Sequence, residues 1–198
     1  MARSISRGDV VLVSGQWKGL TAASIMLGAK LRYGLRSPHA RYTHAALIYD
    51  APSQDPNAIR VVEATARGGV HKAFLSKYQS TGKIVATHID DHDWQQVRAF
   101  LDSVLRAREG YDWATYAGLT LYDLTGTRLC LQKAGTATCS GLVCDALTRA
   151  GFIWSRPPYA CTPSDIDADL AQSDSWQLQW TRPPAREVSR PGSGTACA

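Results

Sequence analysis

The sequence predicts an α+β fold: a central antiparallel sheet packed against helices, in a single domain at residues 1–172. Two observations carry this prediction. Short strand-like apolar runs dominate the first half of the chain, and segments with apolar residues at three- and four-residue steps dominate the second half. The length of 198 residues is enough to bury a core. Residues 173–198, rich in Pro, Arg, Gly and Ser, are expected to form a flexible tail.

The expected strands are apolar runs bounded by turn residues. Gly8-Asp9 leads into the first run, and Gly68-Gly69 turns the chain after the third. The runs cover Val10–Val13, Tyr42–Tyr49, Ile59–Ala64, Val70–Ala73 and Lys83–His88. We expect them to form one antiparallel sheet.

The expected helices show apolar residues at helical spacing. The clearest begins near Trp94, continues through Leu105 and is expected to stop at Gly110. A second, Leu20–Tyr33, is expected to end at Gly34. The other two cover Thr138–Ala150, followed by Gly151, and a short segment from the turn at Thr162-Pro163-Ser164-Asp165 through Leu170.

An acidic cluster, Asp90-Asp91-His92-Asp93, precedes the clearest helix. Carboxylates at an N-cap and in a first helical turn are stabilised by the free backbone N–H groups and the helix dipole, which explains the cluster structurally. A metal site that includes His88 is the alternative, and it is disfavoured because no second pair of ligands is present. We expect neither a metal nor a cofactor.

The formal net charge of +5 suits a polyanionic partner such as nucleic acid, acidic lipid or a cell-wall polymer, without selecting one of them. Part of the excess lies near the two ends, where it is explained by solvated flexible segments. The six tryptophans are spread along the chain and form no stacking stripe, so a nucleic-acid module is disfavoured.

The five cysteines include no CxxC pair. This favours a reduced compartment and a fold that does not depend on disulfides. One disulfide of the Cys130–Cys161 kind is left open. The N-terminus lacks the apolar core of a signal peptide. Leu20–Leu31 is too short and too interrupted to span a bilayer. A cytoplasmic location is therefore the default, with export by a signal-independent route as the alternative. The oligomeric state is left open.

Cys139, His44 and Glu63 together could form a catalytic site. Cys139 lies at the expected start of a helix, where the helix N-terminus and a nearby imidazolium lower a thiol pKa. His44 on a strand could act as general base and then as general acid, and Glu63 on the next strand could orient its ring. If the two strands are antiparallel neighbours, both side chains share one face of the sheet.

Secondary roles at this site are expected for two more residues. The backbone N–H groups of Cys139 and Ser140 form a potential oxyanion site, and Tyr42 could line the site or assist the oxyanion. Cys144 lies deeper in the same helix and is interpreted as a packing residue. His39 and His71 are weaker alternatives for the base. Taken one at a time, each of these residue types is more often structural than catalytic.

Six short motifs follow one another along the chain. They are Gly8-Asp9-Val10-Val11, Tyr42-Thr43-His44-Ala45-Ala46-Leu47-Ile48, Val62-Glu63-Ala64 with Gly69-Val70, Gly110-Tyr111-Asp112, Thr138-Cys139-Ser140-Gly141-Leu142-Val143 and Thr162-Pro163-Ser164-Asp165. In these motifs and their order the chain resembles the permuted branch of the NlpC-type papain-like superfamily, the YiiX-like hydrolases related to lecithin:retinol acyltransferases. The resemblance covers roughly Gly8 to Leu170, and its order, with His44 and Glu63 before Cys139, reverses that of papain.

The resemblance implies a circularly permuted papain-like fold with Cys139 as nucleophile, His44 as base and Glu63 as orienting acid. It implies acyl transfer through a thioester, first of all cleavage of amide bonds in bacterial cell-wall peptides. A lipid acyl hydrolase or acyltransferase with the same site is the alternative, and a non-catalytic binding module is a second. Thr138 stands where the family has an aromatic residue and Gly141 where it has Glu, so the pocket beside the nucleophile is expected to differ.

Overall fold

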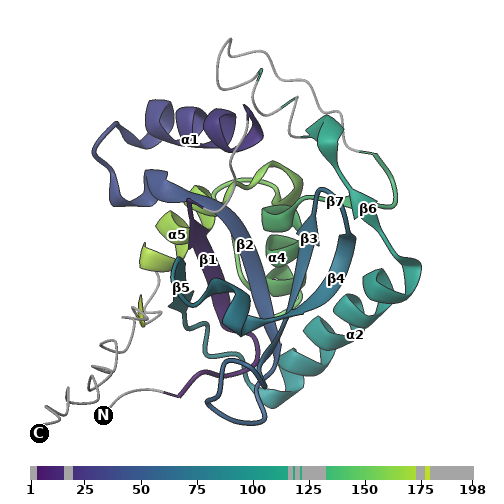
Figure 1. Ribbon diagram of the computed structural model, residues 1–198. Coiled ribbons are helices and arrows are strands. Elements are labelled where there is room, and N and C mark those ends of the chain that lie inside the picture. Colours follow the sequence, from purple (N-terminus) through teal and green to yellow (C-terminus); the bar gives the residue numbers. More distant parts are fainter. Residues whose placement is uncertain are drawn as a thin grey trace, which may run out of the picture.

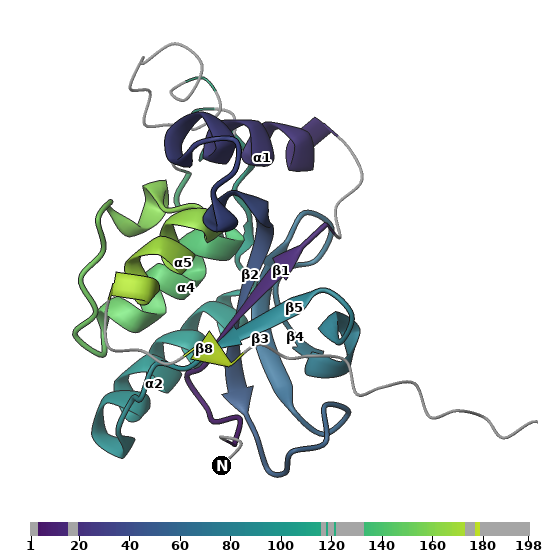
Figure 2. The same cartoon turned by 90° about the vertical axis from the view of Figure 1, so that its left-hand side faces the viewer.

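The computed structural model describes residues 4–15, 20–115, 118, 121, 133–172 and 177–178. The described part of the chain has mixed α and β structure, in which an antiparallel sheet packs against helices, as the sequence predicts (Figure 1). Figure 2 shows the helices α2, α4 and α5 on one side of the sheet and α1 across its upper end.

The sheet has the strand order β4-β3-β2-β1-β5-β8, and all of its neighbours are antiparallel. Its strands are β1 (Val10–Ser14), β2 (Tyr42–Asp50), β3 (Arg60–Thr65), β4 (Gly69–Phe74), β5 (Gly82–Val85) and β8 (Gln177–Leu178). The first four match the expected runs, and β5 covers part of the fifth. The two-residue β8 lies within the expected tail and pairs with β5. The rest of that tail lies outside the described residues.

Strand β5 is shorter than expected, because it ends at Val85 and not at His88. The backbone N–H of Thr87 donates to the Asp9 carboxylate at 3.3 Å, and the Thr87 hydroxyl donates to the Gly8 carbonyl at 2.8 Å. His88 has a φ of 54°, in the left-handed region. Beyond Val85, side-chain contacts with the turn before β1 thus replace the backbone ladder.

The α-helices are α1 (Leu20–Tyr33), α2 (Asp91–Ala107), α4 (Cys139–Thr148) and α5 (Pro163–Gln172). The 3₁₀ helices are η1 (Pro38–Arg41), η2 (Leu75–Tyr78) and η3 (Pro158–Ala160), and β6 (Gly110–Tyr111) pairs in parallel with β7 (Thr136–Ala137). Helix α1 has the expected bounds. Asp90 caps α2 by accepting from the Asp93 N–H at 2.8 Å, which agrees with the structural explanation of the acidic cluster.

The expected end of α2 at Gly110 is wrong. The helix ends at Ala107, and Arg108 adopts a left-handed conformation with φ 51°. The carbonyl of the next residue, Glu109, accepts from the Val70 N–H at 2.8 Å. The chain thus leaves the helix early to reach the start of β4, and Gly110 belongs to β6.

Both faces of the sheet are covered by apolar side chains, because successive residues of a strand point to opposite faces. One cluster joins the helix-facing side chains of the sheet to α2, α4 and α5; its sheet members include Val10, Leu12, Ala45, Leu47 and Val62. The other cluster, on the opposite face, includes Val11, Val13, Ala46, Val61, Leu75 and Tyr78. Among the described helices, none is both long and apolar enough to cross a bilayer.

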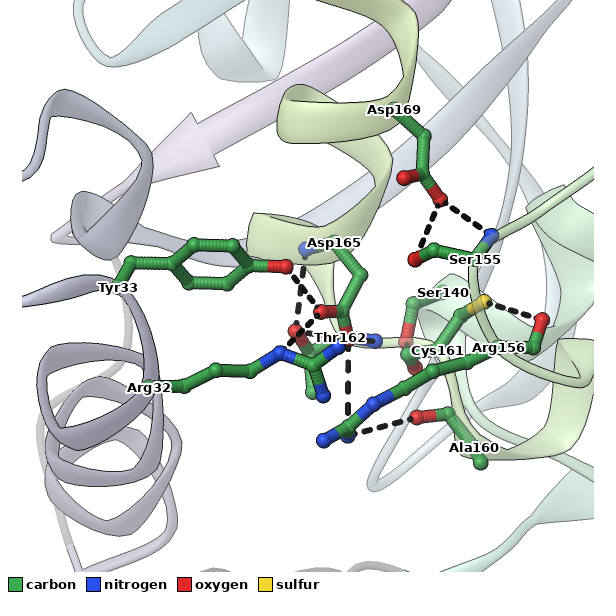
Figure 3. A network of polar contacts seen from close by, with 10 residues as sticks. All are labelled: Arg32, Tyr33, Ser140, Ser155, Arg156, Ala160, Cys161, Thr162, Asp165 and Asp169. Carbon is green, nitrogen blue, oxygen red and sulfur yellow. Dashed lines mark hydrogen bonds and ion pairs between the residues drawn. The ribbon is translucent and has the colours of Figure 1, made fainter.

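Asp165, fully buried near the start of α5, fastens α1 to the rest of the molecule (Figure 3). Its carboxylate accepts from the Tyr33 hydroxyl at the end of α1 and, at 2.8 Å each, from the N–H and hydroxyl of Thr162. Arg32 lies 3.4 Å and Arg156 3.8 Å from the same carboxylate. This buried anion therefore joins the end of α1 to the segment from Arg156 to Asp165, which is far from α1 in the sequence.

Candidate active site

Cys139 is the first residue of α4, and the local sequence explains why the helix begins there. The hydroxyl of Thr138, the N-cap, accepts from the Gly141 N–H at 2.9 Å. A Cβ at position 141 would lie only 2.7 Å from that hydroxyl oxygen, so the glycine leaves room for the cap. The two departures from the family pattern at 138 and 141 thus serve one local structure.

His44 and Glu63 come from neighbouring strands and share one face of the sheet. The register pairs Leu47 with Val62, which places Glu63 opposite Ala46, two residues from His44 on the same face. The His44 Nε2 and Glu63 Oε2 atoms lie 2.6 Å apart, and the side chains are 2% and 0% exposed. The antiparallel neighbours therefore bring these two residues into direct contact, as the sequence predicts.

The Cys139 side chain completes the cluster, because it hydrogen-bonds the His44 side chain. Glu63 contacts the imidazole at Nε2. His44 thus bridges a carboxylate and a thiol at the N-terminus of a helix. Such an environment favours a thiolate beside an imidazolium.

The surroundings of His44 and Glu63 favour the charged form of each side chain. Burial lowers the pKa of His44, but the adjacent Cys139 and Glu63 side chains raise it more, and the balance lifts this pKa from 6.5 to about 9. Burial raises the pKa of Glu63, whereas contacts with His44, Lys77 and Tyr78 lower it more, to about 2. At neutral pH the site therefore holds an imidazolium and a carboxylate.

Three residues that the sequence did not identify as partners of Glu63 contact its carboxylate. The Tyr78 hydroxyl donates to Oε2 and lies 3.4 Å from His44 Nε2. Lys77 Nζ donates to Oε1 at 2.8 Å, and His71 Nε2 lies 3.2 Å from the same oxygen. The proximity of His71 could have been deduced from the Gly68-Gly69 turn, because the hairpin register pairs it with Glu63. Lys77 and Tyr78 lie on η2, which the sequence did not predict.

We expect a nuclear magnetic resonance titration of the His44 ring to show a midpoint of about 9, well above the ordinary 6.5, because Cys139 and Glu63 stabilise the imidazolium. Glu63→Gln removes one of these anionic partners and should lower the midpoint. A wild-type midpoint at or below 6.5 would contradict the arrangement described.

The same shifts contribute to stability in a defined pH window. The raised pKa of His44 stabilises the fold below 6.5, and this contribution is lost as the pH rises through about 9. The lowered pKa of Glu63 stabilises the fold above 4.5, and this contribution is lost as the pH falls through about 2. Both contributions are fully present between pH 4.5 and 6.5.

The side chains of Ser140 and Tyr42, the two residues with expected secondary roles, bond to partners outside the cluster of Cys139, His44 and Glu63. The Ser140 hydroxyl donates to the Cys161 carbonyl at 2.6 Å, which ties the start of α4 to the segment before α5 (Figure 3). Its backbone N–H lies in the first helical turn, where amides have no intrahelical acceptor. The Tyr42 hydroxyl accepts from Arg41 at 2.8 Å, and burial together with nearby Asp167 raises its pKa. An oxyanion role for either residue stays a prediction.

Other histidines and cysteines in the described part of the chain have partners outside the cluster of Cys139, His44 and Glu63. His39 contacts the Asp167 carboxylate at 2.6 Å. Cys144 and Cys161 are buried free thiols, and burial and the contact with Cys161 raise the pKa of Cys144. Cys130 lies outside the described residues. The possible ligand atoms of Asp90, His92 and Asp93 lie within 4.8 Å of one another, but Asp90 is already used as the helix cap.

Access to the cluster is limited, since Cys139 and His44 are each 1% exposed. A pocket of about 200 Å³ opens beside the start of α4. Thr138, Gly141 and Asp145 line its α4 side, and Tyr159 and Glu109 lie among its other walls. A substrate that reaches the sulfur has to displace the side chains that cover it.

Two comparisons, with protein-family models and with curated proteins, find no match. The assignment of a function therefore depends on the geometry of the site and on the motif resemblance.

Proposed function

We propose that the protein is a cysteine hydrolase or acyltransferase that works through a thioester on Cys139. The observation that carries this proposal is the contact chain from Cys139 through His44 to Glu63, with the cysteine at a helix N-terminus. A nucleophile, a base and a group that orients the base are the minimum that covalent acyl transfer requires.

In the proposed reaction the Cys139 thiolate attacks the carbonyl carbon of the substrate, and the carbonyl oxygen becomes an oxyanion. The backbone N–H groups of Cys139 and Ser140, in the first turn of α4, are the proposed donors to that oxyanion. The His44 imidazolium then gives its proton to the leaving group, which departs and leaves a thioester. Neutral His44 takes a proton from water or an acceptor alcohol, whose oxygen attacks the thioester and releases the thiolate.

Glu63 and its neighbours act as positioning residues in this proposal. The carboxylate holds the His44 ring in one orientation and stabilises its charge. Burial and the Glu63 charge raise the pKa of Tyr78 far above the ordinary value, so the phenol stays a donor. Lys77 holds the second oxygen of Glu63. The buried carboxylate therefore remains ionised throughout the cycle.

The finer fold assignment, a circularly permuted papain-like domain, is also part of the proposal. It is supported by the chain order, in which two antiparallel strands that carry His44 and Glu63 precede the helix that carries Cys139. The helix packs against the sheet through Leu142 and Val143.

Amide bonds of bacterial cell-wall peptides are the first proposed substrate class, on the strength of the motif resemblance. A lipid acyl ester is the second candidate, and a specific observation favours it: exposed leucines lie on α1, which crosses the sheet end at which β2 begins (Figures 1 and 2). The pocket beside Thr138 and Gly141 could hold part of either substrate.

The test is to trap the acyl-enzyme. Wild-type protein would be incubated with soluble cell-wall peptides and, separately, with phospholipid vesicles, then quenched in acid and digested. We expect mass spectrometry to find an acyl group on the Cys139 peptide that neutral hydroxylamine removes, as a thioester requires. The substrate that yields the adduct identifies the class. An adduct on Cys144 or Cys161 would refute Cys139 as nucleophile. Neither product nor adduct with either substrate would favour a non-catalytic binding module.

A further inference from the structure

The C-terminal part of α1 and the turn after it expose three leucines. Leu27, Leu31 and Leu35 follow one another at four-residue steps and are 47%, 58% and 78% exposed. Residues four apart in a helix lie on the same face, so Leu27 and Leu31 are neighbours on the surface. Lys30 and Arg36 flank these leucines in the sequence. We call these five residues the α1 surface.

The exposed leucines are not needed to attach the helix. Ala29, 5% exposed, lies on the buried side of α1, and the end of the helix is fastened by Tyr33 and Arg32 to Asp165. A helix that is apolar on its inner side and again on its outer side is normally covered on both. Single exposed leucines are ordinary, whereas a regular row of them marks an interaction site.

The segment that carries this row contains charges of one sign only. From Val10 to Tyr49 the sequence contains no Asp or Glu, and its cations are Lys18, Lys30, Arg32, Arg36 and Arg41. Arg32 is paired with Asp165. Within the described ranges, neither Lys30 nor Arg36 lies within ion-pair distance of a carboxylate. The partner that complements the α1 surface is therefore both apolar and anionic.

We infer that the α1 surface binds the surface of an anionic lipid bilayer. A helix that lies in the interface buries apolar side chains at the level of the acyl chains while its cations stay among the phosphates. Leu27, Leu31 and Leu35 would make the apolar contact, and Lys30 and Arg36 the ionic one. The contact is peripheral and uses none of the residues of the proposed reaction.

Binding in this way would also orient the molecule. Helix α1 crosses the end of the sheet where β2 begins (Figures 1 and 2). His44 is the third residue of β2 and therefore lies near that end. The contacts of Tyr33 and Arg32 with buried Asp165 fix the C-terminal end of the helix to the domain. A protein held by the α1 surface would therefore face the membrane with the end of the sheet that carries the candidate site.

The experiment is co-sedimentation with vesicles of phosphatidylcholine alone and of phosphatidylcholine mixed with phosphatidylglycerol. We expect the wild type to bind the mixed vesicles, and to bind less as salt is raised and screens the cations. The double variant L31D/L35D should bind at least about tenfold more weakly, because two leucines lose their burial in lipid. Ile153→Asp is the matched control, since Ile153 is 93% exposed beyond the far end of α4, and it should bind like the wild type.

Several outcomes would overturn the inference. Equal binding by wild type and L31D/L35D, equal binding to neutral and anionic vesicles, or no binding to either would each do so. Binding of a short RNA in place of vesicles would show that the cations serve a nucleic acid. A dimer in sedimentation velocity that L31D/L35D dissociates would show that a second copy covers the leucines. Cys139→Ala should bind vesicles like the wild type, so failure of the proposed reaction and failure of this inference can be told apart.

Discussion

Replacing Cys139 with alanine is expected to lower turnover of the substrate that forms the acyl-enzyme by at least about 10⁴-fold, because removal of a nucleophile leaves only binding and oxyanion stabilisation. Cys139 is the group that raises the pKa of His44 most. The same variant should therefore lower the midpoint of the His44 titration. Steady-state kinetics and the ring titration measure the two effects independently on one protein.

Cys144→Ala is the matched control for this substitution. Cys144 lies on the same helix, is buried and free, and has a pKa raised by burial and by its contact with Cys161. A buried neutral thiol is a poor nucleophile. We expect Cys144→Ala to keep turnover within a few-fold of the wild type once the folded fractions are matched by circular dichroism. Activity that survives Cys139→Ala would refute the proposed nucleophile.

Asp165→Ala is expected to cause the largest loss of stability among single substitutions outside the candidate site, about 3–5 kcal/mol in the free energy of unfolding. The carboxylate is fully buried and accepts from Tyr33 and Thr162, with Arg32 and Arg156 nearby (Figure 3). Its removal leaves these donors without an acceptor and two guanidinium groups without their anion. Urea denaturation followed by tryptophan fluorescence measures the loss.

Two milder substitutions should each lower the free energy of unfolding by less than Asp165→Ala does. Tyr33→Phe removes one donor to Asp165 and should cost about 1 kcal/mol. Asp169→Ala, on the same helix, removes a half-buried acceptor. Within the described part of the chain, its carboxylate accepts hydrogen bonds from the N–H and hydroxyl of Ser155, at 3.0 Å each. The substitution should cost no more than about 1.5 kcal/mol. If Asp165→Ala cost no more than Asp169→Ala, the network would not be what holds α1 to α5.

Much of the fold follows from local signals in the sequence. Helix α1 ends at Tyr33 before Gly34, and α4 starts after Thr138, as expected. In both cases one residue at the boundary dictates the conformation, the first through a glycine and the second through a capping hydroxyl. The contact between His44 and Glu63 was also predictable, since antiparallel pairing of adjacent strands fixes which side chains share a face.

Other boundaries depended on partners that are distant in the sequence. Helix α2 stops before Gly110 because the Glu109 carbonyl accepts from Val70. Beyond Val85, the bonds of Thr87 to Gly8 and to the Asp9 side chain replace the backbone ladder of β5. The support of Glu63 by Lys77 and Tyr78 depends on η2, a single 3₁₀ turn. Short 3₁₀ turns have no strong local signal, because their side chains show no extended periodicity.

By itself, then, the sequence determined the α+β class, most of the strands and helices, and the residue types that could form a Cys-His-Glu site. These follow from hydrophobic periodicity, capping and strand pairing, which act over a few residues. Only the tertiary structure decided that Cys139 meets His44, that Ser140 is held by Cys161, and that the leucines of α1 face outward. Those facts depend on how α4, α5 and α1 pack around the sheet, and packing is set by the shapes of surfaces brought together from the whole chain.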